Sequence, residues 1–178
     1  LRMSDYDKAV LAIRDGEMAA FTECIAKVPD QADALLIEAA GRPGLVGRNM
    51  TAMLLNGRTD VDYLSYCAAC KKAIDINDVE KSLFLLHWAE HAVSQVEPSF
   101  HGEMASYAYL DHRYIAEQMG KTLVIQPMSF DACTTAVSMG TVDMAISGFA
   151  WREDRAENFN LSNEYSPSDD PNLDRQVI

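Results

Sequence analysis

The stretch SFDACTTAVSMGTVDMAISG, residues 129–148, decides which fold we expect for the C-terminal half of this chain. Its first part, 130–139, has the apolar spacing of a short helix that ends at Gly140. Its second part, VDMAIS at 142–147, has the composition of a buried strand, as does LVIQP at 123–127. Strand, helix and strand in this order predict βαβ units and a parallel sheet, so the sequence predicts an α/β fold for this half.

The residues before position 94 have a different pattern. Short segments with helical periodicity alternate there with polar or glycine-containing turns, which predicts a mainly α-helical N-terminal half. The stretches ALLIEAAGR and YLSYCAACKK recur at a separation of about 29 residues and resemble the paired helices of an ankyrin-type repeat, although the TPLH signature of such repeats is absent. We expect two domains: a repeat-like helical segment of unassigned role over 1–93, and an α/β lobe over 94–178. The expected helices are 5–28, 32–40, 49–56, 63–72, 79–93 and 107–119.

Composition excludes several classes of protein. With 178 residues, of which 48% are hydrophobic, the chain can bury a core. A net charge of −12 argues against nucleic acid as a partner, because phosphates would be repelled. No apolar run reaches the roughly 18 residues of a membrane span, and LRMSDYDKAV is no secretory signal. The chain is therefore cytosolic, a mature secreted protein or an excised piece, and its four cysteines do not distinguish these.

A series of ordered motifs in residues 106–168 carries a specific resemblance to a known family. The motifs are Gly120, the PMSF of 127–130, Gly140, Asp143-Met144, Gly148, Arg155 and the NLSNEY of 160–165. In this order they resemble the first lobe of the extracytoplasmic solute-binding proteins, family 3 type, that deliver polar amino acids to ABC importers. The resemblance implies a periplasmic-binding-protein-like lobe that binds a small ligand and is not an enzyme.

The resemblance also implies a ligand site. Arg155 would pair with the ligand carboxylate, since a guanidinium matches that group with two hydrogen bonds. The backbone at Ser147, Gly148 and Ala150 would supply further polar contacts, and Phe130 would cover the aliphatic part of the ligand. The implied partners are a polar amino acid as ligand and the permease of an ABC transporter. The resemblance also implies that this protein works outside the cytoplasm and needs no cofactor. No second lobe is evident in the sequence, which leaves open whether another chain supplies it.

Some positions depart from the family pattern and leave alternatives open. Ala150 lacks the hydroxyl of the threonine often found there, and Trp151 and Arg152 add bulk. A dehydratase-like enzyme on the same fold is one alternative, but it needs an acid–base pair that the sequence does not reveal. A second alternative is a protein-interaction module formed by the helical repeat.

Two short motifs fall outside the resemblance. His87 and His91 belong to an H-x-x-E-H pattern and would lie one helical turn apart, a spacing that can share a metal ion. A catalytic zinc needs a third protein ligand, so we expect ordinary helix residues and no metal. Cys67 and Cys70 form a C-x-x-C within a predicted helix, where small buried residues are the simpler interpretation.

Overall fold

The computed structural model describes residues 2–98, 103–146, 148–163 and 176–177. The chain divides into two compact units, residues 1–124 and 125–178, and each is described by itself. In unit 1 the helices are α1 (Asp5–Asp15), α2 (Met18–Ile25), α3 (Ala32–Ala40), α4 (Gly44–Leu55), α5 (Tyr63–Asp75), α6 (Val79–Val96) and α7 (Glu103–Gln118), with a 3-10 turn, η1 (Pro29–Gln31), before α3. Unit 2 contains α8 (Phe130–Ser138), β1 (Phe149–Ala150), α9 (Glu153–Asn158) and β2 (Gln176–Val177).

Local sequence signals explain where the helices of unit 1 begin and end. Ser4, Asp62 and Asp78 precede α1, α5 and α6, and each side chain accepts a hydrogen bond from a backbone N–H of the first turn. Gly16 ends α1 in the left-handed conformation at φ 73°, a conformation that glycine adopts without strain. The single helix predicted over 5–28 is therefore wrong: the segment forms α1 and α2, which pack together.

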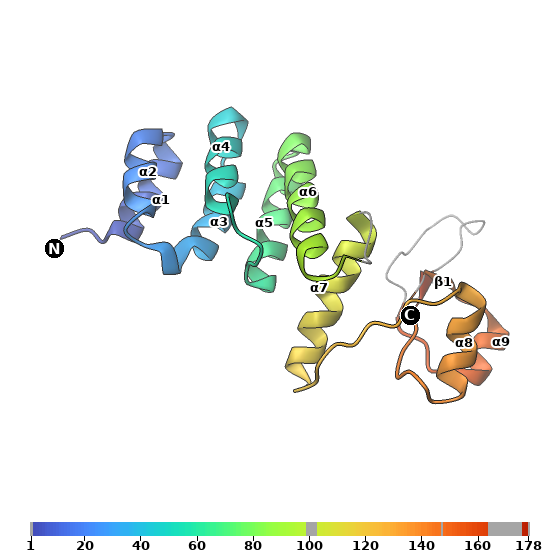
Figure 1. Ribbon diagram of the computed structural model, residues 1–178. Helices are drawn as coiled ribbons and strands as arrows, with labels where there is room; N and C mark the ends of the chain where they lie inside the picture. The colour runs from blue at the N-terminus through green and yellow to red at the C-terminus, as the bar shows by residue number, and fades with distance from the viewer. Residues whose placement is uncertain (1, 99–102, 147, 164–175, 178) are drawn as a thin grey trace. The chain divides into compact units, whose positions relative to one another are not determined.

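Unit 1 is a stack of helix pairs (Figure 1). The pairs α1–α2, α3–α4 and α5–α6 lie side by side, because α3 packs on both α1 and α5 while α4 packs on both α2 and α6. A continuous apolar core runs through the stack, and it includes Phe21, Leu35, Leu36, Met50, Leu55 and Leu85, each at most 2% exposed. Neighbouring pairs thus bury each other's apolar faces, as in repeat proteins. Apart from the segment 5–28, the helices expected in residues 1–93 are present: 32–40 has the predicted bounds, and the other three differ from the prediction by a few residues at one end or both.

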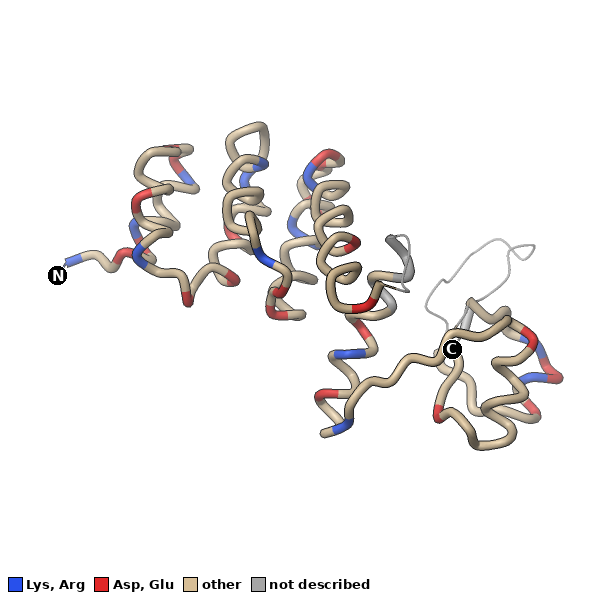
Figure 2. The backbone as a smooth tube through the Cα atoms, viewed as in Figure 1, with Lys and Arg blue, Asp and Glu red and all other residues tan. Residues whose placement is uncertain are grey.

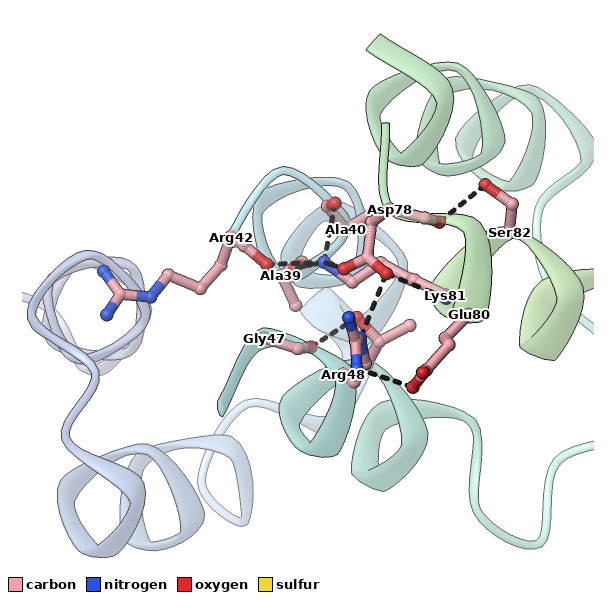
Figure 3. Close-up of polar contacts among 10 residues, drawn as sticks. Ala39, Ala40, Arg42, Gly47, Arg48, Asp78, Glu80, Lys81 and Ser82 are labelled. Carbon is pink, nitrogen blue, oxygen red and sulfur yellow. Dashed lines mark hydrogen bonds and ion pairs between the residues drawn. The ribbon is translucent and has the colours of Figure 1, made fainter. Parts of the chain in front are cut away.

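Cations at helix ends join successive pairs. The Arg42 guanidinium, which follows α3, donates from Nη1 to the carbonyl oxygen of Arg14 at 2.6 Å, in the last turn of α1. Lys81 of α6 donates to the carbonyl oxygens of Ala39, Ala40 and Arg42 at the end of α3, at 3.2, 2.9 and 2.5 Å (Figure 3). The carbonyl end of a helix carries partial negative charge, so a cation there is favourable. A cationic side chain from a later segment therefore caps the C-terminal end of both α1 and α3.

Helix α7 packs against α6 and α5. The ring of Tyr114 stacks on Tyr63, with centroids 4.5 Å apart, and the Tyr63 hydroxyl donates to the Asp111 carboxylate. Arg113 donates to Asp60 at 2.9 Å. Burial and the neighbouring Asp111 both raise the pKa of Tyr63 well above its usual range, so this hydroxyl keeps its proton as a donor.

Unit 2 corrects the fold class predicted for the C-terminal half. Its described residues contain two strands of two residues each, with Phe149 opposite Val177 and Ala150 opposite Gln176 in antiparallel register. The segments 123–127 and 142–146 are not strands, position 147 lies outside the described residues, and Val124 is 73% exposed. The α/β prediction with a parallel sheet is therefore wrong. A β-branched segment becomes a strand only beside a partner backbone, and the described chain offers these two segments none.

Charge and hydropathy add two observations. Acidic residues, coloured red in Figure 2, occur along both units, in keeping with the net charge of −12. Among the described residues, no helix combines the length and the apolar character needed to cross a bilayer.

Candidate ligand-binding site

The side chain of Arg155 is held in place within unit 2. Arg155 lies in the first turn of α9, three residues after Arg152, whose extended backbone begins the helix. Its Nη1 donates to the carbonyl oxygen of Ala150 at 2.7 Å, and the residue is half-buried. A guanidinium that is anchored at one nitrogen keeps further N–H donors for another acceptor.

Two aromatic rings lie close to this guanidinium, on the same side of it. The Arg155 Cζ lies 5.8 Å from the ring centre of Phe130 and 5.5 Å from that of Phe149. The two rings contact each other with centroids 4.7 Å apart and planes tilted by 33°. Arginine within about 6 Å of an aromatic face is attracted by the ring quadrupole. The helix start of α8, the strand β1 and the helix start of α9 thus converge on one cation.

The structure brings together three of the five side chains or backbone groups proposed from the sequence. Arg155, Phe130 and Ala150 lie in direct contact or within cation–π distance. Gly148 is exposed and has φ 59°, immediately before β1. Ser147 lies outside the described residues. What these five positions bind stays a prediction.

Sequence reasoning missed Phe149. This residue is only 5% exposed and supplies one of the two rings around Arg155. An apolar residue two positions after a predicted buried strand is expected to belong to the hydrophobic core, so its residue type alone did not indicate a site. Its separation of six positions from Arg155 becomes meaningful only through the turn between β1 and α9.

The histidine pair lies on α6 of unit 1. His87 Nδ1 is 4.0 Å from the Glu90 carboxylate, and both side chains are well exposed. Among the described residues, no group of three or more His, Cys, Asp or Glu side chains is arranged to hold a metal ion. Within the described residues, His87 and His91 therefore have no third metal ligand beside them.

The cysteine pair lies on α5, where Cys67 is exposed and Cys70 is half-buried, so the expectation of small buried residues is wrong for Cys67. Partial burial of its thiol and the nearby Asp111 and Asp62 carboxylates raise the pKa of Cys67. A reactive thiol needs a lowered pKa, because the thiolate is the nucleophile. The surroundings of Cys67 thus oppose redox or nucleophilic chemistry.

Comparison with known proteins was made at three levels. Residues 106–173 match the family model described as bacterial extracellular solute-binding proteins, family 3. No curated protein and no solved structure matches the chain. The match supports a fragment of a family-3 solute-binding protein and, with it, a solute-binding role. The resemblance inferred from the sequence is confirmed at this level, over less than half of the chain.

The matched segment includes the whole of the candidate site. Phe130, Phe149, Ala150 and Arg155 all fall within 106–173. The match begins in α7, which packs on α5 and α6 within unit 1. Residues 2–98, with the stacked helix pairs, precede the matched segment.

Proposed function

We propose that the C-terminal segment binds a polar amino acid, or a similar small organic acid, as part of the substrate-binding component of an ABC transporter. The observation that carries the proposal is the Arg155 guanidinium, anchored to Ala150 and close to the rings of Phe130 and Phe149. A fixed guanidinium can accept a carboxylate with two parallel hydrogen bonds, which favours organic acids over neutral solutes. The family match supports the same class of role.

The proposal includes the setting in which the protein works. Proteins of this family are typically extracellular or periplasmic, so we propose an extracytoplasmic location and a transporter permease as partner. A ligand held at one small lobe is only partly enclosed, and enclosure is what gives small-molecule sites their affinity. A second lobe would complete the site.

Calorimetric titration of the full chain with the common amino acids and simple organic acids tests the proposal. Arg155→Ala should abolish the binding heat, because it removes the carboxylate partner. Arg152→Ala is the matched control: this neighbouring arginine is exposed and pairs with Asp154 at 3.0 Å. No heat with any ligand, or equal binding by wild type and Arg155→Ala, would contradict the proposal.

A second candidate function belongs to unit 1. The observation that favours it is the stack of helix pairs, because such stacks present extended surfaces to partner proteins. On α5, Leu64 and Ile74 are 57% and 63% exposed. If this unit docks a partner, a partner protein that binds the immobilised wild-type chain should not bind the variants Leu64→Asp or Ile74→Asp. It should still bind Lys71→Ala. Retention by all three variants would contradict docking at α5.

A further inference from the structure

The cation–π pair around Arg155 is unequal. Phe149 is 5% exposed, whereas Phe130 is 45% exposed. Phe149 also belongs to β1, where its backbone pairs with Val177 of β2. Phe130 is the first residue of α8 and is an exposed residue. Of the two rings, Phe149 is therefore the one fixed by its surroundings.

The backbone of β1 reinforces this position. Ala150, the residue after Phe149, offers the carbonyl oxygen that receives Arg155 Nη1 at 2.7 Å. One short strand thus supplies both a hydrogen-bond acceptor and an aromatic face to the same guanidinium. Together they restrict the rotation of a long side chain that would otherwise lose rotamer entropy on binding a ligand.

We propose that Phe149 is a positioning residue that holds the Arg155 guanidinium in one orientation and so presents its remaining N–H donors to a carboxylate. This inference rests on the proposed function of Arg155 as the anion-binding residue. Phe149 acts through Arg155 and does not need to touch the ligand. Pre-organisation of this kind raises affinity because less freedom is lost when the ligand binds.

Nuclear magnetic resonance of the Arg155 Nε–Hε group tests the positioning directly in the full chain. The signal is assigned by its loss in Arg155→Lys. Ring currents should shift it upfield of the Arg152 signal in the wild type. Phe149→Leu should move the Arg155 signal toward the chemical shift of the Arg152 signal. Trp151→Leu, which removes an exposed aromatic ring nearby, should leave the Arg155 signal unchanged. Phe149→Tyr keeps the ring and should keep the shift.

Titration with sodium acetate at constant ionic strength, with sodium chloride as control, tests the effect on binding. Acetate carries only the carboxylate, and it should perturb the Arg155 signal with about tenfold weaker apparent affinity in Phe149→Leu. A wild-type signal that shows no upfield shift, or one that is unchanged in folded Phe149→Leu, would overturn the positioning role. If acetate has no effect on the wild type while Phe149→Leu still moves the signal, the carboxylate function fails and the positioning role stands.

Discussion

The ammonium group of Lys81 donates a hydrogen bond to the carbonyl oxygen of Ala40 at 2.9 Å, so a side chain of α6 closes the carboxyl end of α3. The same group reaches the carbonyl oxygens of Ala39 and Arg42, which uses all three of its donors. Its side chain is fully buried and lies 3.6 Å from the Asp78 carboxylate. The third helix pair is thereby fastened to the second by one cation.

Lys81→Met should lower the free energy of unfolding by about 3 kcal/mol, because buried carbonyl groups and the Asp78 charge lose their partner while the apolar stem is kept. Urea denaturation followed by circular dichroism measures the change. Lys71→Met is the control: its pair with Asp75, 2.6 Å apart, is exposed and should contribute no more than about 0.5 kcal/mol. Equal midpoints for the two variants would show that Lys81 is not a structural cation.

Gly47→Ala should destabilise unit 1 by about 3 kcal/mol through overpacking. A Cβ at position 47 would lie 1.8 Å from the backbone oxygen of Arg42, so α4 would have to move away from the turn that follows α3. Gly41→Ala is the matched control, because its nearest neighbouring atom would lie at 3.6 Å and its φ is −81°. The control should stay within about 1 kcal/mol of wild type in the same denaturation experiment.

Asp78 should make unit 1 sensitive to acid. Burial alone would raise the pKa of Asp78, but hydrogen bonds from the Lys81 backbone and the Arg48 guanidinium hold it below its ordinary value of 3.8. A carboxyl group with a lowered pKa in the folded state contributes stability above about pH 4, and that stability is lost as the pH falls through the folded-state pKa.

Asp78→Asn should therefore unfold at a lower temperature than wild type at pH 7, and the gap should narrow as the pH falls below 3.8. Asparagine can still cap α6, so the difference reports the charge. Thermal melts from pH 7 to pH 2.5 measure it, with Asp75→Asn as an exposed control. A gap that stays constant over this range would mean that the Asp78 charge contributes nothing.

Tyr63→Phe should loosen α7 from α5. The change removes the hydrogen bond to Asp111 while it keeps the ring that stacks on Tyr114, and we expect a loss of about 1 kcal/mol. Amide hydrogen exchange along α7 should become faster. Tyr114→Phe preserves both the stacked pair and the Tyr63 hydrogen bond and serves as the control; if its exchange rates match those of Tyr63→Phe, the bond to Asp111 does not hold the helix.

Arg155→Lys tests the shape of the cation as well as its charge. Lysine keeps the positive charge but not the planar fork, so it cannot pair with a carboxylate through two parallel bonds. We expect at least about tenfold weaker binding of any amino acid that the wild type binds, measured by calorimetry. Binding as tight as that of wild type would show that charge alone suffices at this position.

Much of unit 1 could be predicted from the sequence. The helix over 32–40 was predicted with the bounds that the structure shows, because its apolar spacing and the following GRPG are local signals. Gly16 divides the segment that we predicted as one helix. The prediction was wrong because the apolar spacing continues on both sides of this glycine. The stacking of pairs was only suggested by the repeated stretches.

The candidate site was predicted in part. Arg155, Phe130 and Ala150 were found through ordered family motifs, and the structure places them together. Phe149 was missed, because its role depends on the turn between β1 and α9, which places its ring beside Arg155. The parallel sheet was wrong for a related reason: strand composition at 123–127 reports that a segment suits a sheet, whereas pairing requires a neighbour that composition does not reveal.

The sequence by itself determined the helices of unit 1, the acidic charge and the motif series that marks 106–168, since each depends on residue types at short range. Only the tertiary structure decided that Lys81 closes α3, that Phe149 flanks Arg155 and that segments with strand composition remain unpaired. These features depend on how separate elements meet in space, and their free energy arises from burial and pairing that exist only after the chain has folded.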